Sequence, residues 1–111
     1  MKFVFNNVLK HLLDNGIVYT FRPYCKKWKR IVTIVNKHNT PLAIAEVEYV
    51  GELKYTMGVP YIETDTYPMS LSNYVKHSGF KSEYEWLNCV RKIYKRKHVF
   101  LYKVTILKYL R

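Results

Sequence analysis

Short stretches of β-branched and aromatic residues, broken by glycine, proline and asparagine, constrain the fold of this chain most strongly. Such stretches are typical of β-strands. They predict strands at residues 2–5, 17–22, 30–36, 42–55 and 98–110. Gly51, inside the longest of these stretches, predicts a β-bulge. Residues 37–41 are expected to form a turn, and the glycine- and proline-containing residues 56–68 an irregular loop.

Three short helices are expected between the strands, at residues 6–16, 70–79 and 82–95. Asn6 or Asn7 should cap the first helix and Gly16 should end it. The third helix has the clearest pattern, because its apolar side chains recur at helical spacing on one face. These are Trp86, Leu87, Val90, Ile93 and Tyr94. The sequence SEYE at its start is typical of a capping box, in which Ser82 and Glu85 hold the first turn.

Strands that do not alternate regularly with helices indicate the α+β class. We therefore expect a small curved sheet or barrel with short helices packed on its rim. A chain of 111 residues is expected to form one domain, spanning residues 1–111. Its apolar runs fall short of the roughly 18 residues that span a bilayer. The N-terminus lacks the pattern of a signal peptide, so we expect a cytoplasmic protein without membrane contact.

The cysteines and histidines give no sign of a metal site. Cys25 and Cys89 are far apart in the sequence, and no pair among the four histidines has the spacing of zinc ligands. We therefore expect no metal, no cofactor and two reduced thiols, while a disulfide between Cys25 and Cys89 stays open as an alternative.

The charge balance indicates a polyanionic partner. Lysine and arginine number 19 against 8 aspartates and glutamates, which gives a net charge of +11. No acidic residue follows Glu85, whereas eight basic residues do. They are Arg91, Lys92, Lys95, Arg96, Lys97, Lys103, Lys108 and Arg111. Basic segments of this kind suit nucleic acid, because each neutralised phosphate releases a counterion. A solvated surface that keeps the protein soluble is the simpler alternative.

The segment TFRPYCKKWKR, residues 20–30, combines positive charge with aromatic rings and contains no acid. Its predicted nucleic-acid-binding residues are Arg22, Lys26, Lys27, Trp28, Lys29 and Arg30, and the third helix adds Arg91, Lys92 and Lys95. Lysines in a loop can reach phosphates, the arginine fork suits bidentate contacts, and an exposed tryptophan can stack on a base. A core position for Trp28 is the alternative.

The order of several motifs resembles the ASCH domains of the PUA-like superfamily. LLDNGIVYTFRP is similar to the opening motif of that family, G-x-K-T-x-[TE]-x-R. LAIAEVEYV resembles its central strand, and SGFKSEYEWLNCVRKIYK with VFLYKVTIL resembles its C-terminal half. The resemblance covers nearly the whole chain. It implies a small β-barrel with flanking helices and a cleft that faces RNA or nucleosides.

Some ASCH domains are similar to acetylcytidine amidohydrolases, which use a lysine, a threonine and a glutamate. The resemblance places the threonine at Thr20, the glutamate at Glu85 and the motif arginine at Arg22. The lysine position is Ile17, and an aliphatic side chain cannot act as a base or a nucleophile. The capping box explains Glu85 without catalysis, and strand propensity explains Thr20. Whether the protein is an enzyme therefore stays open, and these residues favour a protein without catalytic activity.

These observations predict a nucleic-acid-binding PUA-like domain, with RNA ahead of single-stranded DNA. One alternative is a hydrolase that acts on modified nucleosides or RNA, either similar to an acetylcytidine amidohydrolase or a ribonuclease. It would use Thr20, Glu85 and a nearby lysine such as Lys26. The other is an interaction module for an acidic protein. The lysine-, tyrosine- and isoleucine-rich composition is compatible with an archaeal or viral source.

Overall fold

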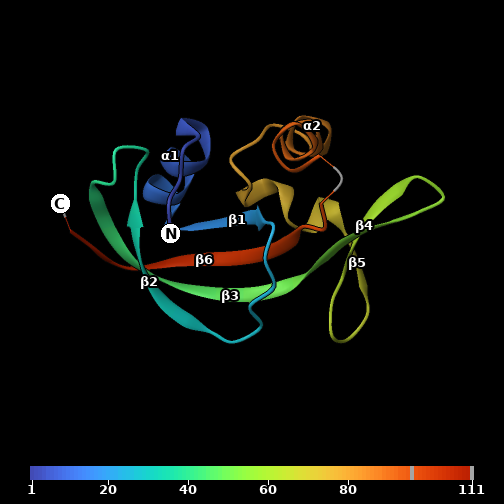
Figure 1. The fold of residues 1–111 in the computed structure, drawn as a ribbon, viewed down its shortest axis with the longest axis horizontal. Coiled ribbons are helices and arrows are strands. Elements are labelled where there is room, and N and C mark those ends of the chain that lie inside the picture. Colours follow the sequence, from blue (N-terminus) through green and yellow to red (C-terminus); the bar gives the residue numbers. More distant parts are fainter. Residues whose placement is uncertain (96, 111) are drawn as a thin grey trace.

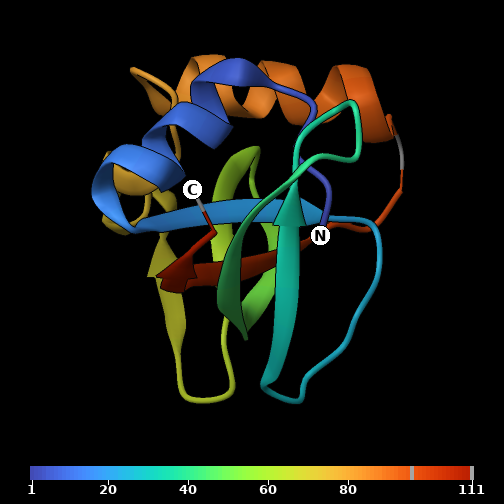
Figure 2. The ribbon, with the colours of Figure 1, turned by 90° about the vertical axis from the view of Figure 1, so that its left-hand side faces the viewer.

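One antiparallel sheet carries the six strands of the computed structural model, which describes residues 1–95 and 97–110 (Figure 1). The strands are β1 (Ile17–Arg22), β2 (Arg30–Val35), β3 (Pro41–Thr56), β4 (Val59–Glu63), β5 (Pro68–Ser70) and β6 (Phe100–Tyr109). Their order is β1-β6-β3-β4-β5, and β2 also pairs with β3. Two helices, α1 (Asn6–Asn15) and α2 (Glu83–Tyr94), lie near the β1 edge of the sheet (Figure 2). The α+β class is therefore confirmed.

The core forms two clusters because side chains alternate between the faces of β1 and β6. Val18 of β1 joins Leu12 of α1 in the first cluster. Phe21 of β1 joins Trp86 of α2 in the second cluster, and the two rings lie 4.9 Å apart. Strand β1 therefore packs on both helices.

The sheet curves but does not close into a barrel, which differs from the expected PUA-like barrel. Residues 2–5 were predicted to form a strand, and this is wrong. Lys2 makes a single parallel bridge to Val35, and the N–H of Phe3 donates to the carbonyl of Val35 at 3.0 Å. Helix α1 begins at Asn6, and the segment before it is bonded to the end of β2 around Val35 without a regular ladder.

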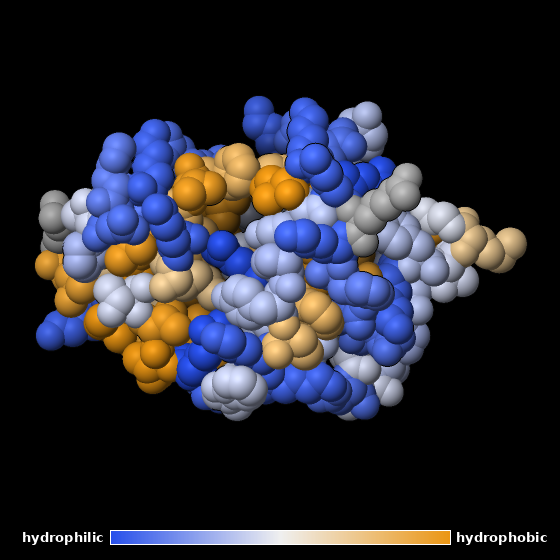
Figure 3. All heavy atoms as spheres, viewed as in Figure 1, coloured by the Kyte–Doolittle hydropathy of each residue, from blue (hydrophilic) through white to orange (hydrophobic). Residues whose placement is uncertain are grey.

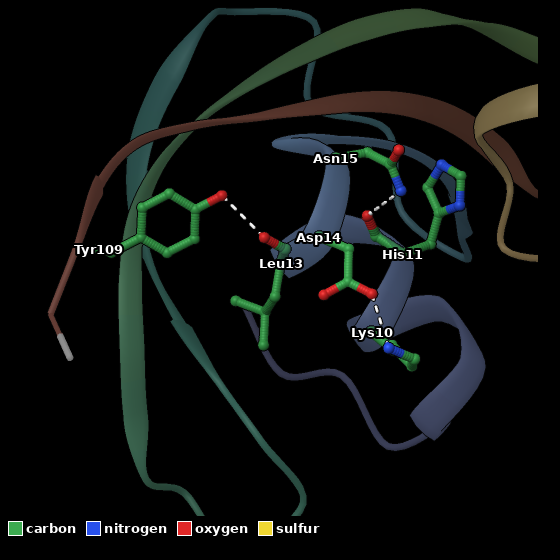
Figure 4. Close-up of polar contacts among 6 residues, drawn as sticks. All are labelled: Lys10, His11, Leu13, Asp14, Asn15 and Tyr109. Carbon is green, nitrogen blue, oxygen red and sulfur yellow. Dashed lines mark hydrogen bonds and ion pairs between the residues drawn. The ribbon is translucent and has the colours of Figure 1, made fainter.

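Helix α1 is fastened to the sheet at its C-terminal end. Gly16 ends it with a φ of 77°, as predicted, and the hydroxyl of Tyr109 donates to the carbonyl of Leu13 at 2.8 Å (Figure 4). The predicted asparagine cap is wrong, because Phe5 occupies the N-cap position and makes no side-chain cap. The amide of Asn7 donates instead to the carbonyl of Gly79.

Residues 56–68 were predicted to be an irregular loop, and this is wrong because they contain a hairpin and strand β4. Met57 and Gly58 have φ values of 51° and 79°, which is the conformation of a two-residue hairpin turn. The expected bulge at Gly51 is confirmed by the register shift between Tyr49 and Gly51. A Cβ atom on Gly51 would collide with the carbonyl oxygen of Glu63, so β4 can approach β3 only at a glycine.

Helix α2 begins at the predicted position, but the capping box forms only in part, because Glu85 accepts from the N–H before the N-cap residue Ser82 and not from that of Ser82 itself. The Oγ atom of Ser82 accepts from the N–H of Glu85, and Glu85 Oε2 accepts from the N–H of Lys81, both at 3.2 Å. The apolar face is narrower than expected, because Ile93 is 43% exposed. Residues 70–79 form two short 3-10 turns, η1 (Leu71–Asn73) and η2 (Val75–His77), in place of one helix. The side chain of Ser70 caps the first turn.

A histidine pair joins α1 to η2. Nε2 of His11 lies 3.0 Å from Nδ1 of His77. Burial lowers the pKa of His11, the nearby His77 lowers it further, and Asp14 opposes this with a smaller effect. Asp14 is itself bonded to Lys10 at 2.7 Å on the same helix (Figure 4).

Acidification should therefore destabilise the protein. The unfolded chain takes up a proton on His11 near the ordinary pKa of about 6.5, whereas the folded protein resists this proton. Stability is full above this pH and falls as the pH drops through about 6.5. Thermal melts between pH 8 and 5 should show this fall, and it should be smaller in His77→Gln. The same fall in wild type and variant would contradict a role for the pair.

No helix of the described residues is long and apolar enough to cross a membrane. Two of the predicted basic residues, Arg96 and Arg111, lie outside the part of the chain that the structure describes.

Candidate nucleic-acid interface

Loop 23–29 crosses the face of the sheet. It leaves β1 at one side, passes β6 and β3, and enters β2 at the other (Figure 1). The hydroxyl of Tyr102 on β6 anchors it from below, accepting from the N–H of Lys26 at 2.7 Å and donating to the carbonyl of Tyr24 at 2.6 Å. Tyr102 is fully buried. The loop backbone is therefore fixed at Tyr24 and Lys26, on either side of Cys25.

The anchored loop presents a tryptophan and two lysines to solvent. Trp28 is 63% exposed, which excludes the core position considered as its alternative. Lys26 Nζ lies 5.4 Å from the ring centre of Tyr24, and Lys27 Nζ lies 5.7 Å from that of Tyr49. We name Lys26, Lys27 and Trp28 the loop triad. It combines cations with an exposed ring, as single-strand-binding surfaces do.

The other predicted cations of the loop are partly engaged. Lys29 forms an ion pair with Glu46 at 3.1 Å, and this hydrogen bond raises the pKa of Lys29. This pair could not be predicted from the sequence, since Glu46 lies on β3 and far from Lys29 along the chain. The guanidinium of Arg30 lies over the rings of Tyr24 and Tyr102, at 5.5 Å and 5.9 Å. Lys29 is therefore a weaker candidate for phosphate contact than the loop triad.

A small cavity runs beside β1, between the N-terminal segment and α2. Its volume is about 100 Å³, and we name it the β1 groove. Figure 3 shows apolar side chains gathered in this region, between the two helices and above the position of β1 in Figure 1. Thr20 and Arg22, the two motif residues, both line it. Burial raises the pKa of Cys89, another lining residue, so its thiol is a poor nucleophile.

The β1 groove also presents a free strand edge. The hydroxyl of Tyr94 donates to the carbonyl of Phe21 at 3.2 Å, so this carbonyl points away from β6. In an antiparallel strand, the N–H and C=O of one residue point to the same side, and the side alternates along the chain. The N–H of Phe21 and both backbone groups of Tyr19 therefore face the groove. These backbone groups can form hydrogen bonds with the polar edge of a flat ring.

The residues of the hydrolase alternative do not meet in the β1 groove. Thr20 lines the groove, whereas Glu85 and Lys26 do not. Glu85 accepts from the backbone N–H of Lys81, just before the N-cap residue Ser82, so its carboxylate is engaged at the start of α2. Ile17, at the lysine position of the motif, begins β1 and pairs with Thr105.

The basic face of α2 borders a second groove of about 420 Å³. Arg91 and Lys95 line it, and Lys92 is exposed beside them on the helix. The guanidinium of Arg91 lies 5.6 Å from the ring centre of Tyr55. Two acids weaken the positive character of this groove, because Glu52 bonds to His98 at 2.8 Å and Glu63 to Lys54 at 3.4 Å.

The two cysteines are free thiols, so the alternative of a disulfide is wrong for this structure. Cys25 is exposed in the loop, whereas Cys89 is half-buried on α2. Among the described residues, no three histidine, cysteine or acidic side chains come together as metal ligands.

Comparison with models of known protein families, with curated proteins and with solved structures finds no match.

Proposed function

We propose that this protein binds single-stranded nucleic acid through the loop triad, with RNA ahead of DNA. The exposure of Trp28 on an anchored loop carries the proposal. An exposed indole on a mobile loop would lose conformational freedom on binding, but the bonds from Tyr102 reduce that cost in advance. The preference for RNA rests on the resemblance to ASCH domains, which stays a hypothesis, as does the PUA-like relationship.

The proposed mechanism combines three contacts. Lys26 and Lys27 attract the phosphates, and Trp28 stacks on an unpaired base. The β1 groove receives a second base against the free edge of the strand. Its volume of about 100 Å³ lies well below the roughly 300–1,000 Å³ of most ligand pockets, which suits a single ring.

Replacing Trp28 by alanine tests the proposal directly. We expect single-strand affinity to fall by about 1–3 kcal/mol and duplex affinity to change much less, because duplex bases are already stacked. Folding stability should change by no more than about 0.5 kcal/mol, because the side chain is exposed. Fluorescence anisotropy with single- and double-stranded RNA and DNA measures the affinities, and a thermal melt measures the stability.

Lys26→Ala and Lys27→Ala are the matched controls in this experiment. Each should weaken all nucleic acids similarly and lower the salt slope by about one unit per lost contact. An unchanged single-strand affinity in Trp28→Ala, with heparin competing as well as RNA, would reduce the site to a charge patch. An acidic protein partner would then be the better explanation.

A further inference from the structure

The groove beside the basic face of α2 takes no part in the function proposed above. We name it the α2 groove. Its volume of about 420 Å³ lies within the roughly 300–1,000 Å³ of most ligand pockets. Its lining residues come from the end of α2, from the segment that follows this helix and from β3. It therefore has room for several groups of a ligand.

Three cations without an acidic partner converge on the α2 groove. Arg91, Lys95 and Lys97 line it, and none of the ion pairs among the described residues includes them. The described part of the lining contains one acid, Glu52, which is bonded to His98 at 2.8 Å. A cavity with this charge balance attracts phosphate groups.

A tyrosine ring orients Arg91 in this groove. The guanidinium lies 5.6 Å from the ring centre of Tyr55, and Nη2 donates to the hydroxyl of the same tyrosine at 3.5 Å. The ring holds the planar fork but does not neutralise it. Arg91 therefore keeps its charge and most of its donors for the oxygens of a phosphate.

A path of contacts joins the α2 groove to the loop triad. Lys27 Nζ lies 5.7 Å from the ring centre of Tyr49 on β3, and this ring lies 6.3 Å from that of Phe100 on β6. Phe100 pairs directly with Glu52, which lines the α2 groove. Two aromatic rings therefore connect Lys27 with the edge of the α2 groove.

The bulge at Gly51 keeps this path on one face of the sheet. Residues that lie opposite each other in an antiparallel pair point to the same face, as do residues two apart on one strand. Tyr49 lies opposite Tyr102 and Glu52 opposite Phe100, so all four share the face that loop 23–29 crosses. Without the bulge, Tyr49 and Glu52 would point to opposite faces.

We propose that one strand of nucleic acid runs from the loop triad along β3 into the α2 groove, where Arg91, Lys95 and Lys97 bind its phosphates. The inference rests on the proposed function and adds a second anchor for the same ligand. The part of β3 from Tyr49 to Tyr55 spans about 20 Å at the usual rise of a strand. At about 3.4 Å per nucleotide, a stacked strand needs about six nucleotides to reach both anchors.

The test measures how affinity depends on ligand length, with oligouridylates of about 2 to about 16 nucleotides. For the wild-type protein, affinity should rise with length and level off once both anchors are occupied. Arg91→Gln should weaken binding of the longest oligomer about tenfold, since a charged hydrogen bond is worth about one factor of ten. The same variant should weaken binding of the dinucleotide by less than about twofold, because the dinucleotide reaches only the loop triad.

Lys97→Gln is a second variant in the α2 groove and should show the same dependence on length. Lys108→Gln is the matched control, because it removes an exposed charge near the other end of β6. Its effect should be small and equal at every length. Arg91 and Lys97 are exposed, so both groove variants should fold, and thermal melts check this.

Equal losses in Arg91→Gln at every length, or no loss at any length, overturn the inference. Trp28→Ala separates it from the proposed function, because that variant should weaken the dinucleotide and the longest oligomer alike. If Trp28→Ala weakens both and Arg91→Gln weakens neither, the loop triad binds without a second anchor. If Trp28→Ala weakens neither, or no oligomer binds, the proposed function fails and the path between two anchors fails with it.

Discussion

Replacing Trp86 by alanine should lower the free energy of unfolding by about 3–5 kcal/mol. Trp86 is 2% exposed, and its ring packs on that of Phe21. The truncation removes the ring contact between α2 and β1 and leaves a cavity that the helix cannot fill without moving. Since a small domain is stabilised by roughly 5–15 kcal/mol in total, the variant should be close to unfolding. Denaturant titration followed by circular dichroism measures the loss.

Tyr84→Ala is the matched control on the same helix. Tyr84 is 75% exposed, so its truncation should change stability by no more than about 0.5 kcal/mol. Similar losses in the two variants would show that α2 does not pack on β1 through Trp86. The β1 groove would then have a different wall from the one described.

Tyr102→Phe should lower the free energy of unfolding by about 2–4 kcal/mol. The change removes one hydroxyl but leaves two loop groups without their partner, the N–H of Lys26 and the carbonyl of Tyr24. Each such group costs about 1–3 kcal/mol when it stays away from water. Single-strand affinity should fall as well, because the loop triad loses its anchor. Thermal melts and anisotropy on the same preparation separate the two effects.

Tyr67→Phe is the matched control, because it removes a hydroxyl from a ring that is 63% exposed. It should change neither the free energy of unfolding nor the single-strand affinity measurably. A Tyr102→Phe protein that keeps full nucleic-acid affinity despite lower stability would argue that loop 23–29 holds its shape without the anchor. The role assigned to Tyr102 in binding would then be wrong, while its role in folding would stand.

Local patterns in the sequence predicted the elements whose causes are local. The Ser82–Glu85 contact and the glycine after α1 each depend on residues within a few positions of one another. The bulge at Gly51 was predicted from the glycine itself, although the pairing that bulges is with β6. The hairpin at Met57 was missed because methionine rarely adopts a positive φ, and the proline two residues after Gly58 looked like a strand breaker. Pairing with β3 overrode both local signals.

The candidate site likewise combines features that the sequence could predict with features that depend on the tertiary structure. The basic character of the loop triad could be predicted from the sequence, whereas the exposure of Trp28 was one of two alternatives that only the structure decides. The Tyr102 anchor could not be predicted, because it lies 76 residues from Lys26 in the sequence. The Lys29–Glu46 ion pair is also a tertiary feature, since Glu46 lies on β3. Spacing in the sequence cannot show which charges remain without a counterion.

The place of β6 in the sheet sets the order of events during synthesis. This strand follows the other five along the chain, yet it lies between β1 and β3 and pairs with both. A nascent chain that ends before Phe100 therefore has two unpaired edges where the finished sheet has an interior strand, and open edges of this kind favour association with other chains. Closing the sheet joins residues as distant as Ile17 and Thr105, so folding should be slow for a chain of this length. Ribosome-bound chains should become resistant to protease only after β6 has emerged.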